Sequence, residues 1–236
     1  MQITNFHPWV LSVLFVIGLL ANYDQAVGEP AAHQLDVRNG KDINEVCAGC
    51  HGEFGQGGKE GEYPRLAGLP ATYIARQLTL FRDRKRTNLA MVESVDHRQM
   101  PDPDIQDVSA FLAGLEITSK LPPADENAPG FNAYERLLAT KRLVQIPLAP
   151  GDAEAGKQIY RRECASCHGA KGQGDQKDAV PFLAGQYTHY LWRQIAKFID
   201  KERAHDPSEP DGVELLAAFQ VEELQNIFAY LSTLDD

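Results

Sequence analysis

Two short motifs of cysteine and histidine are the residues of this sequence best suited to carry chemistry. Cys47 to His51 reads CAGCH, and Cys164 to His168 reads CASCH. In a CxxCH motif the two thiols can add to the vinyl groups of a haem, and the histidine can coordinate the iron. The sequence therefore predicts two covalently bound haem c groups. The residues expected to hold them are Cys47, Cys50 and His51 in the first motif and Cys164, Cys167 and His168 in the second.

Three other uses of such cysteines are a zinc site, a redox-active dithiol and a pair of structural disulfides. Zinc usually takes a second pair of ligands from a separate segment, such as another CxxC, but here a histidine directly follows each CxxC and the motif recurs in a matched context behind an export signal. A redox dithiol is expected within a βαβ pattern, which the sequence lacks. The motifs therefore favour a dihaem c-type cytochrome.

The two motifs belong to two copies of one longer unit. A shift of 117 residues relates the first motif to the second, and it also aligns the residues that follow, without an insertion, over about forty positions. Further on, residues 104–115 resemble residues 223–234 at a shift of 119. The chain is thus a tandem duplication. Residues that align at 117 are Pro64, Tyr73, Gln77, Phe81 and Arg86 with Pro181, Tyr190, Gln194, Phe198 and Arg203.

Apolar residues at spacings of three and four predict helices throughout, and no segment alternates as a set of strands would. We therefore expect an all-α fold. Asp102 is predicted to be an N-cap, with Pro103 in the first turn behind it. The predicted helices are residues 42–47, 72–82, 102–115, 134–144, 154–164, 188–201 and 220–234.

The predicted organisation is a first cytochrome domain at residues 29–119, a linker at 120–150 and a second domain at 151–236. We refer to the two domains as the first copy and the second copy. Five prolines in the linker are typical of a connector. The acidic balance of the chain, 33 acidic against 23 basic residues, argues against binding of nucleic acid.

Residues 1–28 are predicted to be a signal peptide or an N-terminal anchor. Their apolar run, Trp9 to Ala21, is too short to span a bilayer but fits the apolar region of a signal peptide. No Lys or Arg precedes the run, so an uncleaved anchor stays an alternative. We expect a periplasmic protein, soluble after cleavage or else anchored to the inner membrane and facing the periplasm.

The pattern CxxCHG…GxG…P-x-LAG in both copies resembles the dihaem cytochrome c4 family. The resemblance covers Gly40 to Leu115 and Gly156 to Leu234. It implies two class I cytochrome c domains that act as an electron carrier. It also implies that a proline 13 residues after each histidine, Pro64 or Pro181, offers its carbonyl to the imidazole and so orients the ligand.

The resemblance also implies a methionine as the sixth iron ligand in the first copy. Met91 lies in a loop that resembles the family's arginine-to-methionine loop, so we expect Met91 to be the axial ligand. Met100 precedes a helix where an apolar packing residue is usual, and core packing is its alternative role. His97 is a third candidate, with a surface position as its alternative.

The second copy contains no methionine, which departs from the family pattern. His205 lies in the corresponding loop and is the expected iron ligand, because imidazole binds iron well. Its alternative is an ordinary loop histidine facing solvent, with an open or water-bound iron. Lys201 and His189 are weaker candidates.

The expected function is electron transfer, with no catalytic residue, between a respiratory donor and a terminal acceptor or oxidase. The expected partners are redox proteins, one of which could be a membrane oxidase or reductase, and the N-terminal segment could add membrane association. An alternative is a dihaem enzyme, peroxidase-like or oxidising a sulfur compound, with an open site at the second haem. A basic cluster at residues 82–86 is either a solvated helix end or a contact for haem propionates or an acidic partner.

Overall fold

The computed structural model of the chain describes residues 33–96, 100–203 and 212–234. Residues 35–236 form one compact unit that contains both copies, and residues 1–34 form a separate unit. The predicted signal or anchor segment, residues 1–28, lies outside the described residues. Within the described ranges, no helix is long and apolar enough to cross a membrane.

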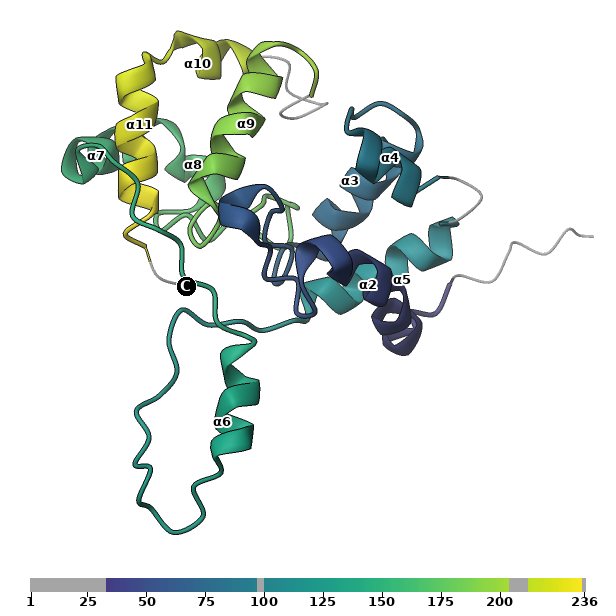
Figure 1. Cartoon of the computed structure of the whole chain (residues 1–236). Coiled ribbons are helices and arrows are strands. Elements are labelled where there is room, and N and C mark those ends of the chain that lie inside the picture. Colours follow the sequence, from purple (N-terminus) through teal and green to yellow (C-terminus); the bar gives the residue numbers. More distant parts are fainter. Residues whose placement is uncertain (1–32, 97–99, 204–211, 235–236) are drawn as a thin grey trace, which may run out of the picture. The chain divides into compact units, whose positions relative to one another are not determined.

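The fold of the described residues is helical, as the sequence predicted, and these residues contain isolated β-bridges but no strand (Figure 1). The α-helices of the first copy are α2 (Val37–His51), α3 (Ala71–Arg82), α4 (Leu89–Ser94) and α5 (Asp102–Ala113). Those of the second copy are α7 (Ala153–Glu163), α8 (Ala165–His168), α9 (Thr188–Ile199), α10 (Gly212–Ala218) and α11 (Val221–Leu231). The linker carries α6 (Ala133–Thr140).

The first and last helices of each copy cross at a glycine. A Cβ atom on Gly40 of α2 would lie 2.2 Å from the carbonyl oxygen of Asp107 in α5. In the second copy, a Cβ on Gly156 of α7 would lie 1.8 Å from the carbonyl oxygen of Asn226 in α11. Both distances are far below van der Waals contact, so each crossing requires a residue without a side chain.

The same two positions of the last helices also hold the beginning of the first helices. The backbone N–H of Asp36 donates to the Asp107 carboxylate at 2.9 Å, and that of Asp152 donates to the Asn226 side chain at 2.7 Å. Asp36 and Asp152 in turn cap α2 and α7 with their own carboxylates. A single residue of the closing helix thus fixes both the crossing and the capped start of the opening helix.

The predicted N-cap at Asp102 is wrong. Pro101 occupies the N-cap position of α5, and Asp102 is the first helical residue. Asp102 and Asp104 lie in the first turn, where their negative charges interact favourably with the helix dipole. The proline-rich start was recognised correctly, but the cap was placed one residue too late.

The two copies contact each other through buried polar groups. The backbone N–H of Arg65 donates to the Gln186 side chain at 3.0 Å, and the Gln186 amide donates back to the Arg65 carbonyl at 3.0 Å. The Arg65 guanidinium also lies over the Phe182 ring at 4.5 Å. Further hydrogen bonds between the copies join Gln176 to Gly68, Arg193 to Gly61 and Glu62, and Lys197 to Thr87.

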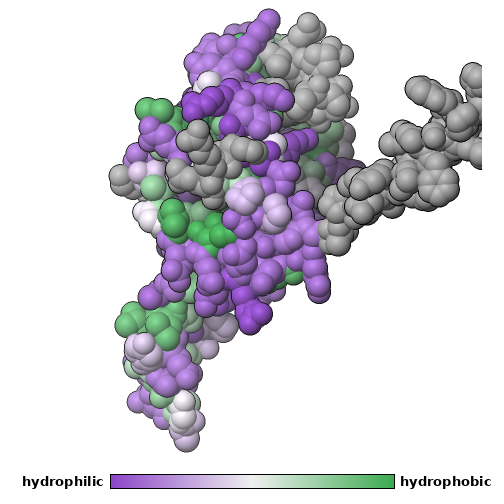
Figure 2. All heavy atoms as spheres, turned by 90° about the vertical axis from the view of Figure 1, so that its right-hand side faces the viewer, coloured by the Kyte–Doolittle hydropathy of each residue, from purple (hydrophilic) through white to green (hydrophobic). Residues whose placement is uncertain are grey.

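The second half of the linker is attached to both copies. Lys141 forms an ion pair with Glu53 at 3.3 Å, and Arg142 lies over the Phe54 ring. Near the end of the linker, the Ala149 N–H donates to Ser232 at 2.9 Å. No residue of α6, which precedes these contacts, is buried, and Leu137 and Leu138 on it are exposed. Figure 2 shows apolar surface on the segment at the bottom of the view.

The helix crossing gives a direct test of the fold. Replacing Gly156 by alanine forces the backbones of α7 and α11 apart, and overpacking of this kind costs about 1–3 kcal/mol of unfolding free energy. Denaturant unfolding of the haem-loaded protein measures the loss. Gly114→Ala is the matched control, because its Cβ would meet its nearest atom at an ordinary 3.5 Å. Equal stability of the two variants would contradict the crossing.

Candidate haem sites

Each CxxCH motif lies at the end of the opening helix of its copy. In the first copy the whole motif is on the last turns of α2, which runs unbroken to His51. In the second copy α7 stops at Glu163, Cys164 joins the two helices, and α8 carries Cys167 and His168. In both copies the first cysteine is half-buried and the second is exposed. The structure therefore presents one thiol at the core and one at the surface.

Burial changes the chemistry of the two inner thiols. Loss of solvent raises the pKa of Cys47, and it raises the pKa of Cys164 to about 11. A redox dithiol needs a thiol with a lowered pKa, since the thiolate is the reactive form. The environment of these two cysteines thus argues against a thioredoxin-like dithiol.

Both histidines are held by the prolines that the sequence indicated. The Nδ1 atom of His51 lies 3.0 Å from the Pro64 carbonyl oxygen, and Nδ1 of His168 lies 3.0 Å from that of Pro181. A carbonyl can only accept, so Nδ1 carries the proton and Nε2 carries the lone pair that an iron ligand needs. Burial also lowers the pKa of His51 and so favours its neutral form. The predicted histidine–proline contacts are confirmed.

The methionines of the first copy occupy different surroundings. Met100 is buried in a cluster with Phe81, Val92 and Ile105, whereas Met91 on α4 is only half-buried and packs against the edge of that cluster. The position of Met100 fits a core-packing role. His97 lies outside the described residues.

Two of the three candidates for the second copy can be located. His189 on α9 and Lys201 after it are both exposed. His205 lies outside the described residues, so its assignment stays a prediction.

Comparison with known proteins identifies the family. A family model described as cytochrome c matches residues 37–116 and again residues 153–235. Cytochrome c4 of Azotobacter vinelandii is 39% identical over 242 residues, with 95% of this chain and 98% of that protein covered. This chain belongs to the dihaem cytochrome c4 family.

Two further relatives agree with this assignment. The thiosulfate dehydrogenase electron acceptor of Stutzerimonas stutzeri is 29% identical over 193 residues, with 80% of this chain and 79% of that protein covered. The solved structure of reduced cytochrome c4 from Pseudomonas stutzeri superposes with a TM-score of 0.65 at 19% identity, with 85% of this chain and 100% of that chain covered. The fold of tandem cytochrome c domains is therefore confirmed.

As a member of the cytochrome c4 family, the chain binds two haem c groups covalently and transfers electrons. The residues present fit this cofactor, because each motif combines two cysteines with a histidine whose Nδ1 is already occupied by a carbonyl. Haem supplies one-electron chemistry when bound. The protein supplies ligands, a fixed imidazole orientation and exclusion of water.

The opening helices of this cytochrome differ by one residue between the copies. Six residues separate Gly40 from Cys47, but seven separate Gly156 from Cys164. The extra residue advances the helix by about 100°, at 3.6 residues per turn, and the second copy has a helix break at Cys164 where α2 of the first copy runs unbroken. The alignment at a shift of 117 does not show this difference. It could have been recognised from the two glycines, which are 116 positions apart instead of 117.

The residue four positions after each glycine also differs between the copies. In the second copy this is Tyr160, which is fully buried and donates its hydroxyl hydrogen to the Gly169 carbonyl at 2.8 Å. In the first copy it is Asn44, also buried, whose amide donates to the Glu53 carbonyl at 3.1 Å. Both side chains tie the opening helix to the segment just after the motif, and the sequence analysis missed both.

Another difference between the copies lies directly beside His51. The Tyr63 ring meets the His51 ring edge-on, with centroids 6.1 Å apart. The aligned residue in the second copy is Val180. The aromatic contact thus restrains the His51 imidazole in a way that valine cannot reproduce.

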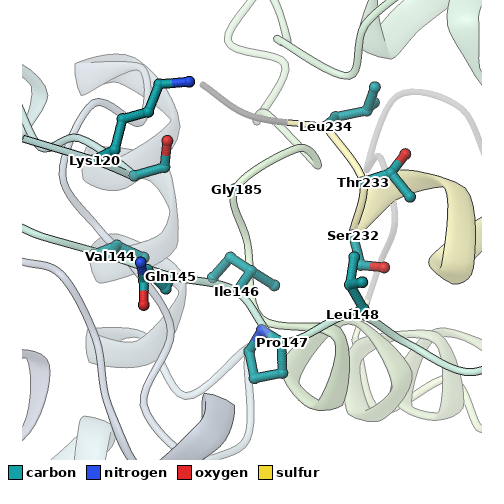
Figure 3. A pocket seen from close by; sticks show the side chains of 11 residues that line it. Lys120, Val144, Gln145, Ile146, Pro147, Leu148, Gly185, Ser232, Thr233 and Leu234 are labelled. Atoms are coloured by element: carbon teal, nitrogen blue, oxygen red, sulfur yellow. The ribbon is translucent and has the colours of Figure 1, made fainter.

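A cavity of about 730 Å³ lies away from both motifs. It is formed by the end of the linker, the Gly185 loop and the residues that follow α11 (Figure 3). Its lining includes Lys120, Ile146, Leu148 and Leu234, and contains none of the predicted haem-binding residues. The cavity is therefore separate from the haem sites.

Tyr160 offers a test of how the second motif is held. Burial raises the pKa of Tyr160, mainly through loss of solvent, so the phenol stays protonated and continues to donate to Gly169. Tyr160→Phe removes this hydrogen bond and is expected to cost about 1 kcal/mol, measured by chemical unfolding. Tyr134→Phe on the exposed α6 is the control and should leave stability unchanged. A loss of the same size in both variants would show that the buried bond contributes nothing.

Proposed function

We propose that this cytochrome is a periplasmic carrier that receives electrons from a dehydrogenase and delivers them to a terminal acceptor or oxidase. The observation that supports this most directly is the matched pair of histidine–proline contacts beside the CxxCH motifs. A relative named as the electron acceptor of thiosulfate dehydrogenase suggests an oxidoreductase of small sulfur compounds as the donor class. The partners are accordingly other redox proteins.

The domain and targeting assignments remain as the sequence predicted them. Residues 29–119 and 151–236 would each bind one haem, and residues 120–150 would connect them. Residues 1–28 would direct export to the periplasm, either as a cleaved signal or as an anchor that retains the protein at the inner membrane.

For the first copy, His51 and Met91 are the proposed axial ligands, with Cys47 and Cys50 as the haem attachment sites. The half-buried position of Met91 supports this choice, since a ligand must be free to face the cofactor. Met100 instead contributes to the core cluster. A thioether ligand raises the reduction potential of a haem.

For the second copy, His168 and His205 are the proposed axial ligands, with Cys164 and Cys167 as the attachment sites. The absence of methionine from the second copy's sequence supports a nitrogen ligand. A haem without the thioether is expected at a lower potential. Electrons would therefore pass from the second copy to the first.

A second function is supported by the same lack of methionine. If no side chain binds the second iron, that copy has an open coordination site, as a peroxidase-like or sulfur-oxidising dihaem enzyme needs. The spectrum of the oxidised protein separates the two functions. Low-spin signals from both haems indicate a carrier, and a high-spin signal that shifts with cyanide indicates an enzyme.

The methionine assignment predicts opposite behaviour of two variants. Met91→Ala should abolish the charge-transfer band of a thioether-bound ferric haem and lower one midpoint potential. Met100→Ala should keep the band but lose about 2–5 kcal/mol of stability, because it opens a hole in the core. Absorption spectroscopy and potentiometric titration provide the readouts. Loss of the band in the Met100 variant alone would reverse the assignment.

The histidine assignment is tested in the second copy. His205→Ala should remove one of the two low-spin signals in low-temperature electron paramagnetic resonance and produce a high-spin signal. His189→Ala is the control, since His189 is an exposed residue of α9. Two unchanged low-spin signals in the His205 variant would exclude His205 as a ligand.

A further inference from the structure

The linker between the copies has two parts, a loop that is closed at its base and a short connector. The backbone N–H of Thr118 donates to the Arg142 carbonyl at 3.0 Å, and the N–H of Val144 donates to the Thr118 carbonyl at 2.9 Å. The chain therefore leaves the first copy at Thr118 and returns to the same place at Arg142. We call residues 119–142, which include α6, the arm (Figure 1). Residues 144–150 alone carry the chain on to the second copy, so the arm is not needed to connect the copies.

The arm carries α6 without burying it. None of residues 119–142 is buried. Asn132 caps the start of α6 by accepting from the backbone N–H groups of Tyr134 and Glu135. A helix of eight residues depends on packing of one face for most of its stability, yet no residue of α6 is buried by the described chain. The helix thus lacks the packing that stabilises most helices of its length.

Three apolar side chains of α6 lie on one face of the helix. Tyr134, Leu137 and Leu138 are spaced by three and four residues, and their exposed fractions are 67%, 63% and 38%. Lys141, the C-cap residue of α6, follows on the same face. Apolar anchors at this spacing are the form in which a helix enters an apolar groove of a partner protein.

The arm is attached beside the first CxxCH motif. Lys141 forms an ion pair with Glu53 at 3.3 Å, and the Arg142 guanidinium lies 4.6 Å from the centre of the Phe54 ring. Glu53 and Phe54 follow His51 by two and three residues. The apolar face of α6 therefore continues, through Lys141, to the surface next to the first haem attachment site.

The second copy has no equivalent attachment for the arm. The residues aligned with Glu53 and Phe54 are Ala170 and Lys171. An alanine cannot form an ion pair, and a lysine cannot offer the aromatic ring on which Arg142 lies. The arm therefore belongs to the first copy alone.

The surface of the first motif is itself open to a partner. Cys50 is exposed, so the cofactor edge that it holds lies at the surface. Val46, one helical turn before Cys50, is 78% exposed. Exposed apolar groups are thus present both on the helix that carries the motif and on the arm attached next to it.

The cations of the arm are mostly engaged within the molecule. Lys141 and Arg142 contact the first copy, and Lys120 lines the cavity between the linker and the second copy. Arg136 lies about 200° around α6 from Tyr134, on the opposite side of the helix. The apolar face therefore has little positive charge of its own to offer a partner.

The carboxylates near α6 are exposed to solvent. They are Asp125, Glu126 and Glu135 of the arm and Glu45 just before the first motif. Opposite charges steer transient association between proteins, so the surroundings of α6 fit a groove rimmed by Lys and Arg. An anionic bilayer surface would instead repel these carboxylates.

The face of α6 is too small for a stable dimer. A stable interface takes about 20–30 residues from each side, whereas electron-transfer contacts are at the small end of the range. The three apolar side chains of α6 supply only the centre of such a small contact. A transient redox partner therefore fits this face better than a second copy of the chain.

We propose that α6 docks a basic redox protein that takes electrons from the first haem. Tyr134, Leu137 and Leu138 enter an apolar groove of this partner, and the basic rim of the groove faces the carboxylates around α6. The partner gains the one electron that the first haem loses. This role of α6 rests on the proposed function of the protein as an electron carrier.

The test compares the reduced, haem-loaded wild type with Leu137→Ser and Val221→Ser. Val221 is 72% exposed at the start of α11, so it is a matched control for the loss of exposed apolar surface. The oxidant is the combined membrane and periplasmic fraction of the native cells, and stopped-flow absorbance measures reoxidation. Leu137→Ser should lower the second-order rate constant about tenfold, while Val221→Ser keeps the wild-type rate and both keep the wild-type melting temperature. Equal rates for Leu137→Ser and the wild type would overturn the proposal.

Hexacyanoferrate(III) separates a failure of docking from a failure of the carrier function. This small oxidant needs no groove, so it should oxidise the wild type and Leu137→Ser at the same rate. Wild-type protein that is oxidised by hexacyanoferrate(III) but not by the native fraction would refute the carrier function, and the docking role with it. A lower rate of Leu137→Ser with hexacyanoferrate(III) as well would show that the substitution alters the haem and would contradict docking.

The charge of the partner is tested at Glu135. Glu135→Lys should slow reoxidation by the native fraction at low ionic strength, and the difference from the wild type should shrink as salt is added, because salt screens exposed charges. Faster reoxidation of Glu135→Lys would indicate an acidic partner and would overturn the proposal.

Two other occupants of the α6 face have signatures of their own. A wild-type dimer in sedimentation velocity that becomes a monomer in Leu137→Ser would assign the face to a second copy. Flotation with vesicles of phosphatidylglycerol and phosphatidylethanolamine that is weakened in Leu137→Ser would assign it to a membrane surface. Either result refutes docking of a redox protein, which predicts a monomer and equal flotation of the two proteins.

Discussion

The close crossing of the first and last helices is the constraint on which each copy depends. Because Gly40 and Gly156 have no side chain, the opening helix lies directly on the backbone of the closing helix. Asp107 or Asn226 then holds the residue that begins the opening helix. The CxxCH motif lies at the other end of that helix in the first copy and directly after it in the second, so its position depends on this crossing.

The loop after each motif supplies the proline carbonyl that contacts the histidine, and this proline lies only 13 residues away in the sequence. The Pro64 and Pro181 carbonyls select one tautomer of the histidines, and burial keeps the inner thiols protonated. In the first copy these effects act together, because burial desolvates both the Cys47 thiol and the His51 imidazole. The folded chain thus holds both histidines in one tautomer and keeps the two inner thiols neutral.

Most of the fold could be predicted from the sequence, because its helices and its duplication follow from patterns within short stretches of chain. Repeated CxxCH motifs, helical periodicity and the 13-residue spacing to proline all act within one copy. The sequence-based prediction missed the buried roles of Asn44 and Tyr160, because one extra residue shifts the opening helix of the second copy. It also placed the N-cap of α5 at Asp102, although Pro101 occupies that position. It also could not reveal that Arg86 is buried, because the partners that bury it come from the other copy.

The interface between the copies combines symmetric and asymmetric contacts, and the difference separates two roles. The symmetric contacts join Arg86 and Gln77 of the first copy to the aligned Arg203 and Gln194 of the second. The Arg65–Gln186 pair has no such equivalence, since the aligned residues are Phe182 and Leu69. The asymmetric pair makes the two faces of the interface distinct, because Arg65 and Gln186 contact each other at positions whose aligned residues cannot form the same hydrogen bonds.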